Sequence, residues 1–146
     1  MVCNRFDISL LTNRLTEVVK YLEKYSSASQ LPIGFFGASA GAAAALRAAA
    51  ILQKSVRAVV SRGGRPDLAM DKLAVVNVPV LLIVGSLDTD VITMNQMALP
   101  KIGSNQKELE IISGASHLFE EPGKLERVAE LAGDWFEEFV PNPVLV

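Results

Sequence analysis

Near the start and near the end of this chain, apolar side chains recur with helical spacing. Between these two segments, apolar side chains form short continuous runs. The first segment predicts a helix, because its apolar positions return at spacings of three and four residues and form one stripe. Asp7 stands directly before this segment and suits the N-cap position. The stripe comprises Ile8, Leu11, Leu15, Val18 and Leu22. The last helical segment has a similar stripe, made of Leu125, Val128, Leu131, Ala132, Trp135, Phe136 and Phe139.

Four short apolar runs predict β-strands, and helical segments separate them. The predicted strands are Leu31–Gly37, Val56–Ser61, Pro79–Gly85 and Leu109–Ser113; the predicted helices between and after them are Ala40–Gln53, a short Asp67–Leu73, Val91–Leu99 and Gly123–Val140. The third strand is apolar without alternation, which is typical of a strand buried on both faces of a parallel sheet. Strands that alternate with helices form parallel sheets with right-handed crossovers. We therefore predict one α/β domain over residues 1–146, in which helices flank a parallel sheet of about four strands in three layers.

Composition and charge exclude several classes of function. Half of the 146 residues are apolar and 21% are charged, which is typical of a globular domain. The net charge of -2 and the lack of a basic cluster argue against a nucleic-acid surface. No apolar run approaches the roughly 20 residues that span a bilayer, and Met1–Asp7 lacks the apolar core of a signal peptide. We expect a cytoplasmic protein without an internal disulfide, because Cys3 is the single cysteine.

The sequence gives no sign of a metal or an organic cofactor. A single histidine and a single cysteine do not make a transition-metal ligand set. Neither a P-loop nor a dinucleotide-binding glycine motif occurs. We therefore expect no metal ion and no cofactor.

The segment Gly37-Ala38-Ser39-Ala40-Gly41 matches the pattern G-x-S-x-G, which is typical of a nucleophile elbow. It lies between the first predicted strand and an alanine-rich predicted helix, as such an elbow requires. The tight turn lifts the serine hydroxyl above the sheet, and its neighbours must be small because strand and helix pass close together. Taken alone, Ser39 could instead be an ordinary helix N-cap.

Asp88 and His117 each follow a later predicted strand, in the chain order serine, acid, histidine. Because the carboxyl ends of parallel strands meet at one rim, where ligands bind, we expect Ser39, Asp88 and His117 to converge there. Taken singly, Asp88 could be a turn aspartate and His117 a loop histidine. Asp90 is a competing acid, which we interpret as a cap because it lies closer to the following helix.

This set of residues suits acyl transfer. His117 would take the proton of the Ser39 hydroxyl, and Asp88 would orient the imidazole through its other nitrogen. The backbone N–H of Ala40, directly after the serine and at a helix start, suits the oxyanion of a tetrahedral intermediate.

Other charged residues near the rim have less definite roles. Arg62 and Arg65 follow the second predicted strand, where they either bind an anionic group of a substrate or extend into solvent. Glu120 and Glu121 are interpreted as complements of the positive end of the last helix rather than as chemical groups.

These motifs make the chain resemble the α/β-hydrolase superfamily and, within it, a dienelactone-hydrolase-like group. The likeness spans nearly all of residues 4–140, and the segments that carry it are Leu31–Gly41, Ser61–Asp67, Gly85–Asp88 and Gly114–Gly123. The resemblance implies an α/β-hydrolase fold, catalytic roles for Ser39, Asp88 and His117, and a small-molecule ester or acyl substrate. It also implies relatives that are fused to, or named for, a phosphoribosyltransferase domain, although this chain has no such motif.

The resemblance extends to the C-terminal portion of that fold, because the superfamily places several strands before the elbow strand and only one predicted helix precedes Leu31 here. The earlier portion normally supplies the second oxyanion N–H, and removing one such donor typically slows a reaction on the order of 100–1,000-fold. We therefore expect weak activity. We also expect the elbow strand, with Ile33, Phe35 and Phe36, to be a bare edge that favours a homo-oligomer.

Three hypotheses follow for the function. The first is a serine hydrolase that acts on an ester or similar acyl bond through an acyl-enzyme. The second is a catalytically impaired hydrolase remnant that serves as an interaction domain. The third is a phosphate- or nucleotide-binding domain that uses the Gly37–Gly41 turn as an anion cradle.

Overall fold

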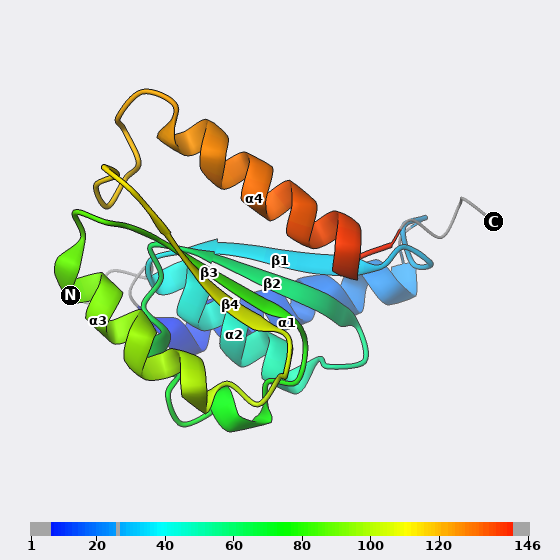
Figure 1. Cartoon of the computed structure of the whole chain (residues 1–146). Coiled ribbons are helices and arrows are strands. Elements are labelled where there is room, and N and C mark those ends of the chain that lie inside the picture. Colours follow the sequence, from blue (N-terminus) through cyan, green and yellow to red (C-terminus); the bar gives the residue numbers. More distant parts are fainter. Residues whose placement is uncertain (1–6, 26, 142–146) are drawn as a thin grey trace.

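The computed structural model describes residues 7–25 and 27–141, so Cys3 and most of the stretch examined for a signal peptide lie outside it. A parallel sheet of four strands, in the order β1-β2-β3-β4, forms the centre of the fold (Figure 1). The strands are β1 (Ile33–Ala38), β2 (Val56–Arg62), β3 (Val80–Gly85) and β4 (Lys107–Ile112). The predicted α/β class and four-stranded parallel sheet are confirmed, with strand ends that differ by one or two residues.

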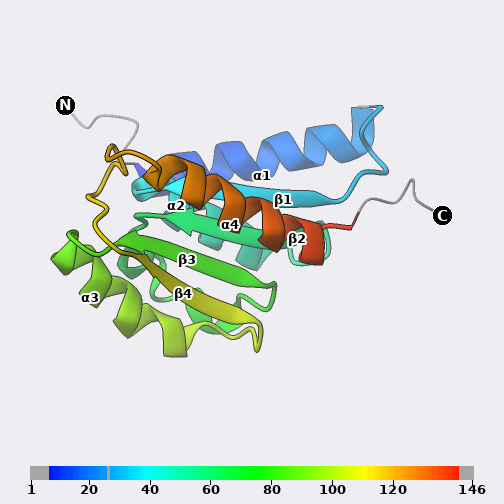
Figure 2. The same cartoon turned by 45° about the horizontal axis from the view of Figure 1, so that its top comes forward.

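Helices cover both faces of this sheet. Two connecting helices, α2 (Ala40–Ile51) and α3 (Thr89–Ala98), lie on one face together with α1 (Ile8–Tyr25), whereas α4 (Lys124–Phe139) lies on the other (Figures 1 and 2). The strands follow one another in a single direction across the sheet, and right-handed crossovers then place the connecting helices on the same face. No helix within the described ranges combines the length and apolar character needed to cross a membrane.

Two hydrophobic cores form, one on each face of the sheet, and β3 contributes to both. Val80 and Leu82 belong to the core beneath α1 and α2, whereas Leu81 and Ile83 belong to the core beneath α4. Every residue of β3 is buried, as predicted from its lack of alternation. This rigid central strand positions the loop that follows Gly85.

The predicted helix Asp67–Leu73 is wrong. Two short 3-10 helices, Pro66–Ala69 and Leu73–Val75, occupy this crossover instead. Their hydrogen bonds span three residues, as in that from the Leu68 N–H to the Arg65 carbonyl, 3.0 Å. A segment this short does not offset the nucleation cost of an α-helix.

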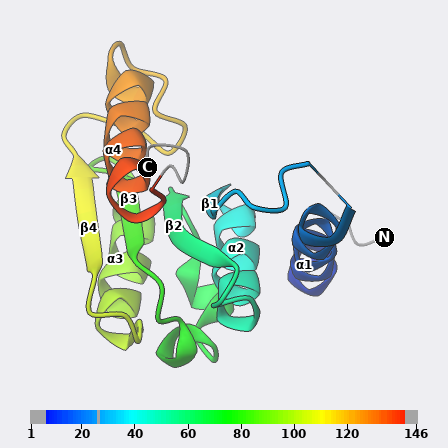
Figure 3. The same ribbon diagram turned by 90° about the vertical axis from the view of Figure 1, so that its right-hand side faces the viewer.

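The buried face of α1 also differs from the predicted stripe. Thr12, Thr16 and Val19 are buried, whereas Val18 is 53% exposed. The two threonines are accommodated because each hydroxyl donates to the carbonyl four residues earlier, at 2.6 Å and 2.9 Å. Helix α1 packs on the alanine-rich α2 and lies beyond β1, at the edge of the sheet (Figure 3). Its apolar stripe is therefore only partly covered.

The last helix keeps most of its predicted stripe. Val128, Ala132 and Trp135 are buried in the core beneath α4, and Leu131, Phe136 and Phe139 pack against that core. The exception is Leu125, which is 49% exposed in the first turn. Asp7 acts as predicted at the start of α1, since its carboxylate accepts from the Leu10 N–H at 3.0 Å.

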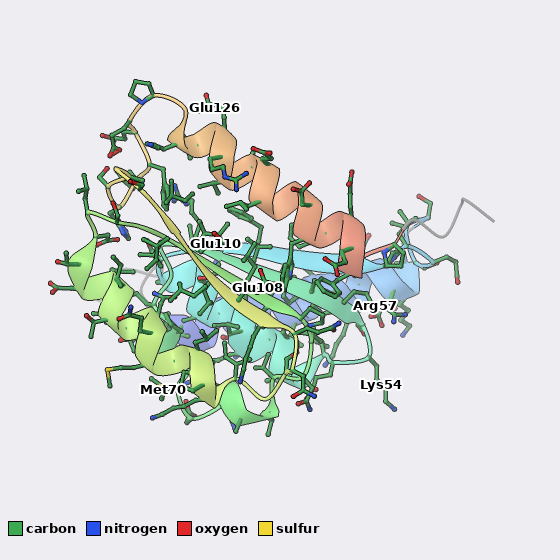
Figure 4. The ribbon with its side chains drawn as sticks, viewed as in Figure 1. Lys54, Arg57, Met70, Glu108, Glu110 and Glu126 are labelled. Atoms are coloured by element: carbon green, nitrogen blue, oxygen red, sulfur yellow. The ribbon has the colours of Figure 1, made fainter. Side chains whose placement is uncertain are left out.

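The two edge strands differ in chemistry. Strand β1 carries no charged residue, and its Phe36 is 50% exposed although Phe35 points into the core. Strand β4 carries Lys107 and two acidic residues, Glu108 and Glu110, which Figure 4 labels along it. Charged side chains protect an edge strand from pairing with another chain, and β1 lacks this protection.

Candidate active site

Ser39 stands at the junction of β1 and α2 with a strained backbone. Its φ is 50° and its ψ is -123°, a conformation that costs about 1–3 kcal/mol for a residue with a side chain. Backbone bonds hold it there: its N–H donates to the Arg62 carbonyl at 3.3 Å and its carbonyl accepts from the Arg65 N–H at 3.2 Å. Its hydroxyl makes no capping bond to α2, so the alternative of an ordinary N-cap is wrong.

The two glycines of the elbow motif are not equivalent. A Cβ added to Gly37 would lie 2.7 Å from the Ala42 Cα, which shows how closely the strand and the helix pass. A Cβ added to Gly41 would meet nothing within 4 Å. Packing therefore requires the first glycine but not the second, which corrects the expectation that both must be small.

Ser39, His117 and Asp88 lie together at the carboxyl rim of the sheet. The Ser39 Oγ lies 3.0 Å from the His117 Nε2, and the His117 Nδ1 lies 2.6 Å from the Asp88 Oδ2. A carboxylate only accepts, so Nδ1 carries the proton and Nε2 is free to accept from the serine hydroxyl. The imidazole is 42% exposed and the carboxylate 16%, so the histidine is the more open of the two side chains.

Short backbone contacts hold the three loops against one another. The Leu87 N–H donates to the Ala115 carbonyl at 3.0 Å, which ties the loop of Asp88 to the loop of His117. Gly63, in the loop after β2, has a φ of +53° and packs under the imidazole: a Cβ there would lie 3.2 Å from the His117 Cε1. A side chain at this position would be both strained and crowded.

Asp90, the competing acid, does not act as a cap. The N-cap position of α3 is Asp88, whose carboxylate makes no capping bond and instead meets the imidazole. Asp90 is exposed in the first turn of α3. The choice of Asp88 over Asp90 as the partner of His117 therefore agrees with the geometry, but the role given to Asp90 was wrong.

Sequence reasoning missed the contact between Glu121 and Ser116. Its carboxylate accepts from the Ser116 N–H at 2.6 Å rather than from the first turn of α4, which begins at Lys124. The Ser116 hydroxyl donates to it as well, at 3.2 Å, and these bonds hold the pKa of Glu121 below its usual range. A carboxylate shortly after the histidine, across a turn, was the signal available in the sequence.

Arg62 and Arg65 have different surroundings. Arg65 forms a two-point salt bridge with Asp67, at 3.0 Å and 2.8 Å, which raises the pKa of the arginine and lowers that of the aspartate. The Arg62 guanidinium lies 5.7 Å from the centre of the Phe119 ring, and its buried Nε has no hydrogen-bond partner among the described residues. Of the two arginines, Arg65 is paired with a carboxylate, whereas Arg62 forms no salt bridge with another described residue.

Two further observations limit the reactions that the rim could support. Ala40 is the first residue of α2, so its N–H is one of the donors that a helix leaves without an intrahelical partner. Within residues 7–25 and 27–141, no three His, Cys, Asp or Glu side chains gather as metal ligands would. The arrangement contains a hydroxyl, an imidazole, a carboxylate and a helix start, which are the components of acyl transfer.

Comparison with known proteins settles the family. Residues 3–140 match the dienelactone hydrolase family. The chain belongs to this family. A dienelactone hydrolase from Anabaena variabilis, solved by crystallography, is 51% identical and superposes with a TM-score of 0.90, covering 92% of this chain and 62% of that one. The suspected α/β-hydrolase classification is therefore confirmed.

Other relatives share the fold over part of their length. Est1E from Butyrivibrio proteoclasticus superposes with a TM-score of 0.77 at 16% identity, over 90% of this chain and 70% of that one, which shows the fold alone. Two curated proteins from strains of Mycobacterium tuberculosis are named "Putative phosphoribosyl transferase" and are 53% identical over 140 residues. That match covers 96% of this dienelactone hydrolase family member but 31% of each curated relative.

Proposed function

We propose that this chain is a serine hydrolase that cleaves an ester or a similar acyl bond through an acyl-enzyme. The observation that carries the proposal is the run of two hydrogen bonds from Ser39 to His117 and from His117 to Asp88, at 3.0 Å and 2.6 Å. A serine hydroxyl is a weak nucleophile at neutral pH, and it needs a base that is itself held in place by a third group. Membership of the dienelactone hydrolase family supports the same reaction class.

The proposed reaction has two halves. Ser39 Oγ attacks the acyl carbon while its proton passes to the His117 Nε2, and Asp88 stabilises the imidazolium that forms. The tetrahedral intermediate collapses, and the leaving group takes the proton from His117 as the acyl-enzyme forms. A water molecule then attacks the acyl carbon and gives its proton to His117, which forms a second tetrahedral intermediate. When this intermediate collapses, the Ser39 Oγ leaves and takes the proton back from His117, and the acid is released.

The oxyanion of each tetrahedral intermediate would be held by the Ala40 N–H at the positive start of α2. We identify one such donor within the part of the chain that the structure describes. Loss of a single oxyanion donor typically slows a reaction on the order of 100–1,000-fold, so we expect low turnover. Esters with good leaving groups, which need the least help from this donor, are the substrates on which activity is easiest to measure.

We infer further that the substrate carries an anionic group. Arg62 lies at the same rim as Ser39, and its guanidinium has no salt bridge to another described residue. Arg65 was the second candidate, but its charge is already balanced by Asp67. We therefore assign the recognition of a carboxylate or similar anion to Arg62 alone.

The hydrolysis of p-nitrophenyl acetate tests the proposal. Ser39→Ala is expected to abolish the slow turnover of the wild-type chain, because no other hydroxyl of the described residues hydrogen-bonds to the imidazole. Ser86→Ala is the matched control, since Ser86 lies at the same rim but its hydroxyl accepts from the Gly114 N–H. Retention of the full rate by Ser39→Ala would assign the hydrolysis to another residue or a contaminant and would favour a remnant without activity.

The unpaired edge of β1 supports the second hypothesis, an interaction role. We propose that two copies of this chain pair through β1, because the strand has no charge to oppose a second copy and leaves Phe36 half exposed. Sedimentation should then show a dimer that Phe36→Lys dissociates. Ile111→Lys, a matched change on the exposed side of β4, should leave the dimer intact. A wild-type chain that sediments as a monomer at all concentrations would contradict this.

We do not extend the phosphoribosyl transferase name to this chain. The match covers 31% of each protein that carries the name, so their activity can reside in the rest of their length. The third hypothesis, an anion cradle at the elbow, is less well supported, because the Ser39 hydroxyl is engaged by His117 rather than free at the turn. We retain the expectation of a cytoplasmic enzyme without a cofactor.

A further inference from the structure

The loop that carries His117 runs from the end of β4 to the start of α4 and contains no regular secondary structure. Such a loop would leave the imidazole free to move unless its backbone is fixed. The imidazole itself is 42% exposed, and among the described residues it hydrogen-bonds to Ser39 and Asp88 alone. The position of His117 therefore depends on the contacts of the residues beside it.

Ser116, directly before the histidine, is held from two sides. Its carbonyl accepts from the Phe119 N–H at 3.1 Å, within a tight turn. Its N–H donates to the Glu121 carboxylate, at 2.6 Å from Oε1 and 3.2 Å from Oε2, and its hydroxyl donates to Oε2 at 3.2 Å. Glu121 thus closes the loop on itself and engages both the backbone and the side chain of the residue before His117.

The turn that Glu121 closes is strained. Phe119 has a φ of 56°, a conformation that a bulky side chain rarely adopts, and its ring is 1% exposed in the core beneath α4. Strain of this kind costs on the order of 1–3 kcal/mol and persists only where surrounding contacts hold it. The burial of Phe119 provides one such contact and the Glu121 bonds provide the other.

We propose that Glu121 is a positioning residue, which holds the backbone of Ser116 so that the imidazole of His117 stays between Ser39 and Asp88. The catalytic consequence rests on the proposed serine hydrolase function. Glu121 does not touch the reacting atoms and acts through Ser116. A carboxylate suits this task, because hydrogen bonds to an ionised acceptor are shorter and roughly twice as strong as neutral ones. The lowered pKa of Glu121 agrees with an ionised acceptor.

Three variants isolate this contact. Glu121→Ala removes the acceptor, and Glu121→Gln keeps its shape and one acceptor oxygen but removes the charge. Glu120→Ala is the matched control, because Glu120 is the exposed neighbour and its side chain makes no hydrogen bond to another described residue. Thermal unfolding should show that all three variants fold.

The first readout does not depend on activity. His117 is the single histidine of the chain, so ¹⁵N NMR of its imidazole can be assigned without ambiguity. In the wild type the two nitrogens should show one dominant tautomer with the proton on Nδ1. In Glu121→Ala the two nitrogen shifts should move toward each other as the tautomers average, whereas Glu121→Gln should be intermediate and Glu120→Ala unchanged.

The second readout is the rate at which a fluorophosphonate labels Ser39. We expect a fall on the order of 10- to 100-fold in Glu121→Ala, as for a catalytic group displaced by about 1 Å, with partial recovery in Glu121→Gln. The kcat for p-nitrophenyl acetate should fall by the same factor while KM stays constant, which a general loss of structure would not produce.

The outcomes separate the two proposals. Imidazole shifts in Glu121→Ala that equal those of Glu120→Ala would overturn the positioning role, whatever the activity. Altered shifts together with a wild-type chain whose Ser39 is never labelled would support the positioning of His117 and contradict the serine hydrolase function. Altered shifts with an unchanged labelling rate would show that the contact moves the imidazole without affecting the chemistry, and would overturn the catalytic part of the inference.

Discussion

At the carboxyl end of the sheet, Ser39, His117 and Asp88 are joined by two hydrogen bonds, whereas the amino end of the sheet borders an open cleft. The amino end has a cleft of about 640 Å³, bordered by the end of α1 and the starts of β1 and β2. Its charged lining residues, Lys54, Arg57 and Glu23, form no salt bridge with another described residue. Figure 4 shows Lys54 and Arg57 at this end.

An open cleft does not by itself indicate a site of chemistry. At the carboxyl end, strain is stored in the backbone of Ser39 and Phe119, and the connecting loops are bonded to one another. Strained residues persist only where neighbouring contacts over-determine them, and they cluster at functional sites. At the amino end, exposed side chains surround an open cleft without such constraint. We therefore assign function to the constrained rim rather than to the open cleft.

Among the substitutions that compare the two ends of the sheet, the largest effect is expected at the acid of the rim, Asp88. Asp88→Asn should lower kcat for p-nitrophenyl acetate on the order of 1,000- to 10,000-fold relative to wild type, because an amide no longer fixes the proton on the His117 Nδ1. The melting temperature should change little. Asp90→Asn is the matched control and should stay within about twofold of wild type, since Asp90 is an exposed surface residue. An equal loss of kcat in the two variants would contradict the assignment of Asp88 as the acid.

A smaller effect is expected at the arginines after β2. Arg62→Gln should raise KM about tenfold for a p-nitrophenyl ester that carries a free carboxylate, the equivalent of about 1.4 kcal/mol for one charge-assisted contact. KM for the uncharged acetate ester should not change. Arg65→Gln should affect neither ester, because Asp67 already balances the Arg65 charge. If Arg65→Gln rather than Arg62→Gln raised KM for the carboxylate ester, the Arg65–Asp67 pair would have to open to receive the substrate.

The smallest effect is expected at the amino end. Lys54→Gln and Arg57→Gln should each leave kcat/KM for both esters within about twofold of wild type, because these side chains lie at the opposite end of the strands. Steady-state kinetics of the two variants, alongside Arg62→Gln, measures this directly. A selective loss on the anionic ester in Arg57→Gln would show that the amino-end cleft takes part in substrate binding.

Much of the rim could be predicted from the sequence, because parallel strands bring their carboxyl ends together. Once the runs ending near Gly37 and Gly85 were assigned as strands, the positions of Ser39 and Asp88 followed from topology. His117 followed for the same reason, after the last strand. These are consequences of backbone connectivity, and they do not require side-chain packing to be known.

Contacts that depend on packing could not be predicted. The periodicity of α1 identified a helix but not its buried face, which Thr12, Thr16 and Val19 form while Val18 is exposed, because the position of α2 decides which side of α1 is covered. The sequence shows that Arg65 and Glu121 are charged, but not which groups they contact. Local turns determine their partners, which are Asp67 and Ser116. Turn geometry depends on strain and burial, as at Phe119, and no spacing rule encodes it.

Activation of Ser39 by His117 is the central step of the proposed mechanism. Incubation with a fluorophosphonate, digestion and mass spectrometry test this step directly. We predict one covalent adduct, on the peptide that contains Ser39, formed in the wild type, absent in Ser39→Ala, and nearly absent in His117→Ala although that variant keeps the serine. An unlabelled wild-type chain, or a His117→Ala variant labelled at the wild-type rate, would contradict the account.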